Sequence, residues 1–193
     1  MELDRGYIQE LESWLVGRAA EGLQQDGLAP RPQVHFILED HAQPHVGYVI
    51  SRRYQRGADA YGAITDLGCA AAALCASRLV VMWEECDLRA SLYGPGEHPD
   101  GIVTVDATLN GHILTWRPYD IRLGPVGPYG APTVWPKWGR VSQLPDAELP
   151  PAINELLNTW RTYFARLDTT SELAGMQRLG YEFRWLIHDE HAG

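Results

Sequence analysis

The chain is poor in cysteine, in lysine and in long apolar runs. Three cysteines, Cys69, Cys75 and Cys86, are present among the 193 residues, and no two of them have the Cys-x-x-Cys spacing. An odd number of cysteines cannot close into a complete disulfide set, so a reducing compartment fits best. No run approaches the ~18 apolar residues that a membrane-spanning helix needs.

The first residues also lack the basic and apolar regions of a signal peptide, because Met-Glu-Leu-Asp-Arg leads directly into an amphipathic pattern. Together with the cysteine count, this predicts a cytoplasmic protein. Lys137 is the only lysine beside fifteen arginines. This usage, alongside abundant Ala, Gly and Pro, suggests the GC-rich genome of a bacterium or its phage.

Positive charge is scarce relative to negative charge. The chain has 25 acidic and 16 basic residues, which gives a formal charge of −9. Because nucleic acid has the same sign as this acidic protein, non-specific DNA or RNA binding is disfavoured. We therefore expect no non-specific binding of nucleic acid. Since no apolar run is long enough to span a bilayer, we expect no membrane partner either.

Common catalytic motifs are absent as well. The sequence has no Gly-x-Ser-x-Gly elbow, Walker A loop, Gly-x-Gly-x-x-Gly turn or zinc-deaminase signature. Glu84 and Glu85 end an apolar run, as acidic residues do in some nuclease sites, but Cys86 and Asp87 follow in place of the usual lysine. An edge or salt-bridge role for Glu84 fits better. These absences lower the expectation of an enzyme, and no cofactor is predicted.

What is present is the patterning of one globular domain. Hydrophobic residues make up 45% and charged residues 21% of the chain, and its length is close to that of a single domain. We predict one α+β domain over 1–193, with a mainly antiparallel (mixed) sheet packed by three or four helices. Its expected parts are an N-terminal helix in 1–30, strands and a buried helix in 33–123, a Pro/Gly/Trp loop in 124–140, and C-terminal helices and a final strand in 146–187.

Apolar residues spaced by three and four predict the helices. The first extends from Asp4 to Gln25, and the second, rich in small residues, from Asp59 to Ser77. A third, strongly amphipathic helix covers residues 150–167. Ser171 is a candidate cap for a short fourth helix that ends near Gly180.

Alternating or continuous apolar runs predict the strands. The run Leu79–Trp83 should be central in the sheet, and alternation beyond it predicts a long or bent strand that continues to Leu92. The Asn110-Gly111 pair predicts a hairpin with a type I′ turn. The remaining predicted strands are 34–38, 46–50, 102–109, 112–119 and 181–187.

The segment from Gly124 to Gly139 holds four prolines and four glycines, so we predict no regular structure there. Tyr129, Trp135, Lys137 and Trp138 lie in it. Aromatic side chains on a stiff segment supply contact area at low entropic cost, as binding hot spots do. Alternatively, both tryptophans are buried in the domain's own core beneath a covering loop.

The leading hypothesis is therefore a non-catalytic protein-binding or assembly module. Its candidate binding residues are Tyr129, Trp135, Lys137 and Trp138, and a sheet edge could contribute. The partner would be another protein, or a second copy of the chain through self-association.

The link between the first two predicted strands supports an alternative. Glu39, Asp40, His41 and His45 place four possible metal ligands within seven residues, and divalent cations prefer such oxygen and imidazole donors. A metal-dependent hydrolase or nuclease would use His41, His45 and either Glu39 or Asp40. A polar turn between two strands would have the same composition.

Overall fold

The computed structural model describes residues 5–187. The helices are α1 (Arg5–Asp26), α2 (Ala58–Thr65), α3 (Leu67–Ala73), α4 (Glu85–Tyr93), α5 (Pro151–Tyr163) and α6 (Thr169–Arg178). The strands are β1 (Gln33–Ile37), β2 (His45–Ile50), β3 (Arg78–Glu84), β4 (Gly101–Thr108), β5 (His112–Val126), β6 (Pro132–Trp138), β7 (Ser142–Pro145) and β8 (Glu182–Trp185).

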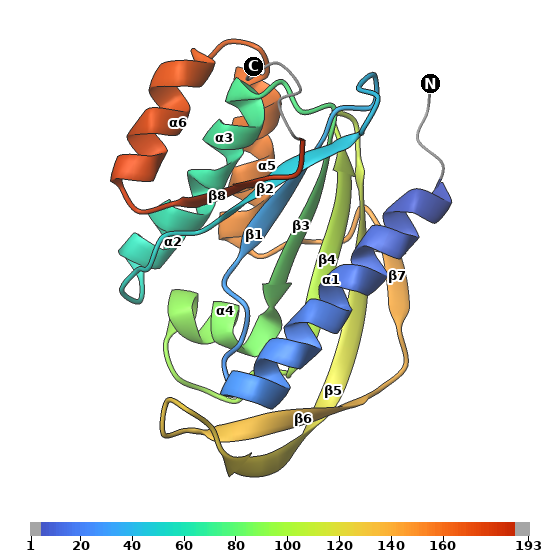
Figure 1. Ribbon diagram of the computed structural model, residues 1–193, viewed down its shortest axis with the longest axis vertical. Coiled ribbons are helices and arrows are strands. Elements are labelled where there is room, and N and C mark those ends of the chain that lie inside the picture. The colour runs from blue at the N-terminus through green and yellow to red at the C-terminus, as the bar shows by residue number, and fades with distance from the viewer. Residues whose placement is uncertain (1–4, 188–193) are drawn as a thin grey trace.

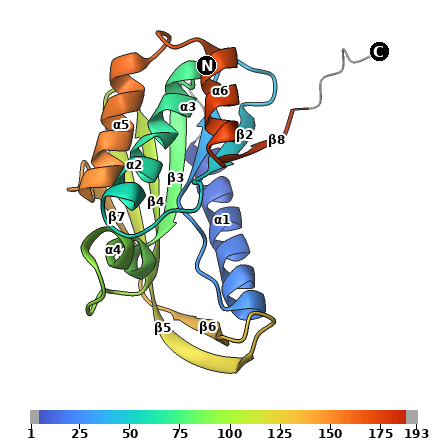
Figure 2. The same cartoon turned by 90° about the vertical axis from the view of Figure 1, so that its left-hand side faces the viewer.

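All eight strands belong to one antiparallel sheet, in the order β6-β5-β4-β3-β1-β2-β8, with β7 also paired to β5. Helix α1 lies on one face of the sheet, and α2, α3, α5 and α6 lie on the other (Figure 1 and Figure 2). The predicted α+β fold with a mainly antiparallel sheet is confirmed.

The larger core lies between the sheet and the layer of α2, α3 and α5. As predicted, β3 is central, because β1 and β4 pair with its two edges and residues Leu79–Glu84 are buried. Trp160 of α5 is fully buried in this core and donates its indole N–H to the carbonyl of Ala76. The amphipathic pattern of the third predicted helix therefore identified a true core element.

The second predicted helix is interrupted at Asp66 into α2 and α3. At the interruption, the Tyr181 hydroxyl hydrogen-bonds to the Ala63 carbonyl and the Asp66 carboxylate. In α3, Gly68 lies directly against the backbone of α5: a Cβ at this position would be 2.3 Å from the Leu156 carbonyl oxygen. The small residues of this segment thus permit close helix packing, as their pattern indicated.

Helix α1 forms the opposite layer through a second apolar cluster, in which Leu11 and Leu15 pack against Val80 and Met82. One buried side chain of α1 is charged. The Glu12 carboxylate accepts hydrogen bonds from the Thr104 hydroxyl and the Arg117 guanidinium. These contacts fix α1 over β3, β4 and the start of β5.

The predicted extension of the central strand to Leu92 is wrong, because that segment is helix α4. Glu84 ends β3, and its carboxylate accepts a hydrogen bond from the Asp87 N–H, which caps the helix. The same carboxylate accepts from the Gly101 N–H and the Tyr119 hydroxyl. Burial raises the pKa of Glu84, which is a buried capping residue and not an edge or salt-bridge residue.

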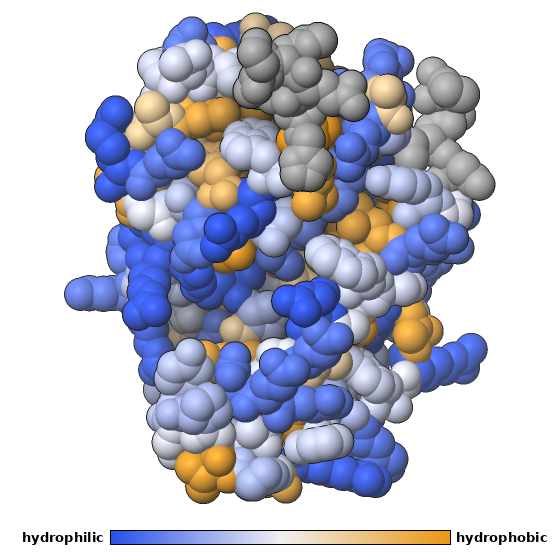
Figure 3. All heavy atoms as spheres, in the orientation of Figure 1, coloured by the Kyte–Doolittle hydropathy of each residue, from blue (hydrophilic) through white to orange (hydrophobic). Residues whose placement is uncertain are grey.

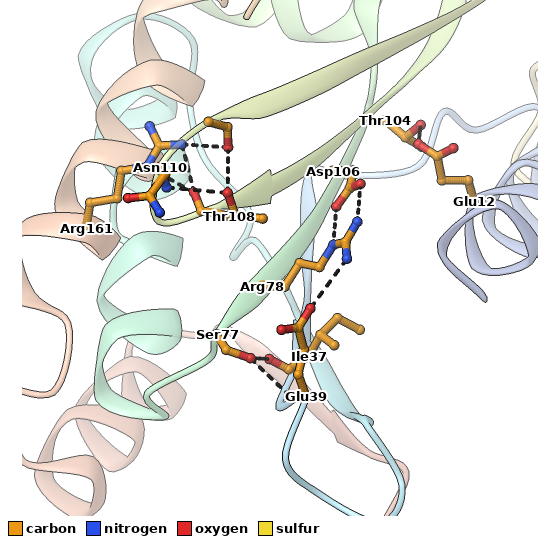
Figure 4. A network of polar contacts seen from close by, with 11 residues as sticks. Glu12, Ile37, Glu39, Ser77, Arg78, Thr104, Asp106, Thr108, Asn110 and Arg161 are labelled. Carbon is orange, nitrogen blue, oxygen red and sulfur yellow. Dashed lines mark hydrogen bonds and ion pairs between the residues drawn. The ribbon is translucent and has the colours of Figure 1, made fainter. Parts of the chain in front are cut away.

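Strands β4 and β5 form the predicted hairpin, with Ala107 opposite His112. Its turn is not type I′, since neither Asn110 nor Gly111 has a positive φ. Instead, the Thr108 N–H donates to the Gly111 carbonyl, and Arg161 of α5 donates to the carbonyls of both residues (Figure 4). A distant helix therefore helps to set the turn geometry.

The last helix and the last strand lie near the ranges predicted for them. Helix α6 is capped by Asp168, whose carboxylate accepts from the Ser171 N–H, so Ser171 is not the cap itself. Strand β8 pairs with β2 at one margin of the sheet. It is shorter than the predicted strand 181–187, because it ends at Trp185. The predicted polar tail, 188–193, lies outside the described residues.

Candidate functional site

The segment predicted to be an irregular loop is a β-hairpin, which we call the arm and define as residues 119–138. The second half of β5 pairs with β6, from Tyr119 opposite Trp138 to Val126 opposite Pro132. The turn is closed by a hydrogen bond from the Gly127 N–H to the Ala131 carbonyl, and Gly130 has a φ of 78°. The arm forms one end of the molecule, below α1 and α4 in Figure 2.

Glycine and proline build this hairpin where their density suggested that no strand could form. A Cβ at Gly124 would be 2.6 Å from the Trp135 indole nitrogen. The indole can therefore lie across β5 only because residue 124 has no side chain. Strand β6 ends the sheet order, and edge strands tolerate proline because one side of the strand has no partner. Pro132 and Pro136 are therefore compatible with a strand at this position.

The tip of the arm, beside its turn, is packed against the end of α1. Thr133 is buried and donates its hydroxyl hydrogen to the Pro125 carbonyl. A Cβ at Gly27, just beyond α1, would be 2.4 Å from the Pro132 carbonyl oxygen. Val134 joins the apolar cluster beneath α1. These contacts hold the arm against the body of the protein.

The four predicted binding residues are accessible. Tyr129 is 68%, Trp135 51% and Trp138 41% exposed, and the side chain of Lys137 is 61% exposed, with its Nζ 3.8 Å from an Asp120 carboxylate oxygen. The indole of Trp138 meets the buried Tyr119 ring edge-on, at 5.5 Å between centroids. The alternative in which both tryptophans belong to the core is thus excluded.

Further apolar residues of the arm were not predicted as site residues. Ile121, Leu123 and Val126 of β5 are 47%, 72% and 69% exposed. At the lower end of Figure 3, where Figure 1 places β5 and β6, hydrophobic atoms reach the surface. The apolar alternation that continues past Tyr119 was the available signal, but the adjacent prolines and glycines concealed the strand.

The charge of the arm differs in sign from that of the whole chain. Within the arm, Arg122 and Lys137 stand against Asp120 alone, a net charge of +1 in a protein of −9, and Arg140 follows just beyond the arm. The arm therefore combines exposed aromatic and aliphatic side chains with a locally positive field.

The predicted metal ligands in the link between β1 and β2 have separate contacts. Glu39 accepts a hydrogen bond from Arg78, which also makes a two-bond contact with Asp106 (Figure 4). The exposed His41 ring hydrogen-bonds to the backbone of Gln43. Asp40 lies in the turn that follows β1.

Of the four predicted metal ligands, only His45 is buried. Its ring Nε2 is 3.0 Å from Nδ1 of His35, a residue of β1 that sequence reasoning did not select. Across residues 5–187, no group of three or more His, Cys, Asp or Glu side chains is placed to hold a metal ion. As arranged here, the link is a polar turn with one buried histidine pair beside it.

The histidine pair is buried between the sheet and α1. His35 is fully buried and stacks on the Tyr48 ring at 4.7 Å between centroids. Burial lowers the pKa of His35 well below its usual value and, together with the neighbouring His45, favours a neutral ring. Burial lowers the pKa of His45 to about 4.

This pair should make stability depend on pH. In the unfolded chain both rings take up protons near pH 6.5, whereas the folded protein resists protonation, so the stability present above pH 6.5 is lost as the pH falls. Between pH 6.5 and 5 the loss should approach about 1.4 kcal/mol per pH unit for each histidine. The difference between the free energies of unfolding in urea at pH 7.5 and at pH 5 measures this loss.

A His45→Gln variant should show a smaller loss of stability between these two pH values, because one buried imidazole is removed. His41→Gln makes the same change at the exposed end of the link and should leave the wild-type loss intact. Equal losses in all three proteins would contradict the assignment to the buried pair.

Comparisons of the chain with models of known protein families, with curated proteins and with solved structures find no match. In the part of the chain that the structure describes, no helix has the length and apolar character needed to cross a membrane.

Proposed function

We propose that this protein is a non-catalytic protein-binding module, and that its arm holds an acidic segment of a partner protein. The observation that carries this proposal is the exposure of Trp135 and Trp138 on a paired strand. Large aromatic side chains exposed on an ordered element are costly in water unless a partner covers them, and they are enriched among binding hot spots.

The charge of the arm supports an acidic partner. Arg122, Lys137 and Arg140 are spread along or just beyond the arm, and Asp120 is the one opposing charge between Tyr119 and Val141. A segment that alternates acidic and apolar residues would match both the positive field and the exposed aliphatic side chains. Complementary charges of this kind raise the association rate and select among partners.

Side chains, and not strand addition, are expected to make the contact. Pro132 and Pro136 have no backbone N–H, so β6 offers an incomplete row of donors to an added strand. Edge prolines of this kind prevent sheet-to-sheet pairing. The proposal therefore places recognition on the indole rings and the cationic side chains.

Selection from a random peptide display library tests this function. The wild-type protein should enrich peptides that contain both acidic and apolar residues. Replacing both Trp135 and Trp138 by alanine should weaken a selected peptide by at least ~30-fold, the equivalent of one hot-spot side chain. Circular dichroism and urea unfolding establish whether the variant remains folded.

Trp14→Ala provides the matched control, because Trp14 is 50% exposed but lies on α1. It should leave binding of the selected peptide unchanged. Enrichment that does not depend on the arm tryptophans, or their replacement unfolding the protein without a selective binding defect, would contradict the proposal.

Two further measurements separate other occupants of the arm. A concentration-dependent dimer in sedimentation equilibrium that is lost in the double variant would replace the partner protein by a second copy of this chain. Binding of a fluorescent single-stranded oligonucleotide through the same two tryptophans would replace it by nucleic acid. Either result would overturn the proposal as stated.

A further inference from the structure

The two tryptophans of the arm lie on opposite faces of its hairpin. Successive side chains of a strand point to opposite faces, and Trp135 and Trp138 are three residues apart on β6. Residues directly opposite each other on paired strands share a face. The register places Arg122 opposite Trp135. It places Tyr119 opposite Trp138. The arm therefore has two surfaces, and these differ in composition.

One surface, which we call the charged face, carries every charged residue of the arm. It is formed by Asp120, Arg122, Trp135 and Lys137. The side-chain contacts agree with the register, because Nζ of Lys137 is 3.8 Å from an Asp120 carboxylate oxygen. The Trp135 ring lies over Gly124, the next residue after Arg122 on this face of β5. The two cationic side chains thus share one face with a single indole.

The other surface, the apolar face, has no charged residue. It is formed by Tyr119, Ile121, Leu123, Val134, Pro136 and Trp138. Tyr119 and Val134 belong to the apolar cluster beneath α1, so this is the side of the arm on which α1 lies. The Trp138 ring meets the Tyr119 ring edge-on at 5.5 Å. Trp138 therefore has an aromatic partner within the protein, and the charged face is turned away from α1.

The cations of the charged face are available to a partner. Arg122 is exposed, and among residues 5–187 it forms no ion pair. Lys137 is paired with Asp120, but their side chains are 61% and 82% exposed. Exposed ion pairs of this kind contribute little, since water solvates both charges. Lys137 can therefore exchange Asp120 for a carboxylate of the partner.

We infer that the acidic segment of the partner protein docks on the charged face alone, with its carboxylates on Arg122 and Lys137 and an apolar side chain on the Trp135 indole. Directly opposite residues have Cβ atoms ~5 Å apart and diagonal ones are ~7–8 Å apart, so one extended segment reaches all three side chains. The inference rests on the proposed function and narrows it, because Trp138 and the aliphatic residues of the apolar face do not contact this segment.

Single replacements of the two tryptophans test the inference, with the peptide selected by the wild-type protein as the probe. Fluorescence anisotropy of the labelled peptide with the full chain gives the affinity. Trp135→Ala should weaken binding by at least ~30-fold, and Trp138→Ala by less than about threefold. Leu123→Ala, at a side chain 72% exposed on the apolar face, should also leave binding unchanged without disturbing the contact between Trp138 and Tyr119.

A spectroscopic measurement gives the same answer without any variant. In protein labelled with ¹⁵N at the tryptophan indoles, the selected peptide should shift the Trp135 resonance and leave the Trp138 resonance in place. Circular dichroism establishes that each variant used for the affinities remains folded.

Charge variants test the carboxylate contacts. Arg122→Glu should weaken the selected peptide by at least ~10-fold. Arg166→Glu makes the same change in net charge at an exposed residue of the link between α5 and α6, at the end of the molecule opposite the arm (Figure 2), and should have little effect. Asp120→Asn should strengthen binding by roughly two- to fivefold, because it removes the carboxylate that competes for Lys137. A peptide whose acidic residues are replaced by their amides should not distinguish Arg122→Glu from the wild type.

The outcomes separate this inference from the function on which it rests. Equal losses in Trp135→Ala and Trp138→Ala, or a shift of the Trp138 resonance alone, would overturn the inference and leave the proposed function in place. An effect of Arg122→Glu no larger than that of Arg166→Glu would overturn it as well. Undiminished binding to the double tryptophan variant would instead reject the proposed function itself.

Discussion

Asp106→Ala is expected to lower the free energy of unfolding by about 3–5 kcal/mol. The Asp106 carboxylate accepts two hydrogen bonds of 2.7 Å from the Arg78 guanidinium, and the side chains are only 10% and 12% exposed. Truncation leaves a buried guanidinium with Glu39, at 3.4 Å, as its remaining ion-pair partner. Chemical denaturation measures the loss.

Asp120→Ala is the matched control, since its ion pair with Lys137 is solvent-exposed and 3.8 Å long. It should change the free energy of unfolding by no more than about 0.5 kcal/mol. The double replacement Arg78→Met with Asp106→Leu removes both charges and should be less destabilising than Asp106→Ala alone. Equal effects of Asp106→Ala and Asp120→Ala would show that the buried ion pair contributes no more to the free energy of unfolding than the exposed one.

Gly68→Ala is expected to destabilise the protein by about 1–3 kcal/mol, the range for an overpacked core. The added Cβ would lie 2.3 Å from the Leu156 carbonyl oxygen and 3.0 Å from Cβ of Thr159, so α3 and α5 must move apart. Helix propensity alone predicts the opposite sign, a gain of about 0.5–1 kcal/mol for replacing a helical glycine by alanine.

Gly62→Ala makes the same change in α2, where no atom lies within 4 Å of the added Cβ. It should show the gain from propensity without a packing cost. Thermal unfolding of both variants gives the comparison. A stabilised Gly68→Ala protein would mean that the α3–α5 contact is looser than this structure shows.

Gly62 and Gly68 also show what the sequence pattern could predict about the helices and what it could not. Both fall in the predicted helix Asp59–Ser77, and the small residues there correctly indicated close packing. The position of the interruption at Asp66 could not be predicted, because it involves contacts of Tyr181, which is distant in the sequence. Helix periodicity reports a face to be buried but not the shape of the surface that buries it.

The sequence identified the residues of the candidate site by their type, but it did not predict the hairpin that carries them. The aromatic and cationic residues of the arm were selected because few other residues in the chain combine these properties so densely. Their exposure could not be derived, since a covering loop and a hairpin with exposed tryptophans share the same composition. His35 escaped selection because one histidine in an alternating strand is usually a solvated residue, and here α1 buries that face of β1.

The sequence by itself determined the α+β class, α1, the strands β1 and β2, the central position of β3 and the amphipathic α5, because apolar periodicity is a local property of the chain. Only the tertiary structure decided that Glu84 caps α4, that the proline-rich segment is a paired arm with its tryptophans exposed, and that His35 and His45 share a buried hydrogen bond. Apolar periodicity does not encode hydrogen bonds or burial of this kind: Glu84 also accepts from Gly101 and Tyr119, and the arm packs against the end of α1.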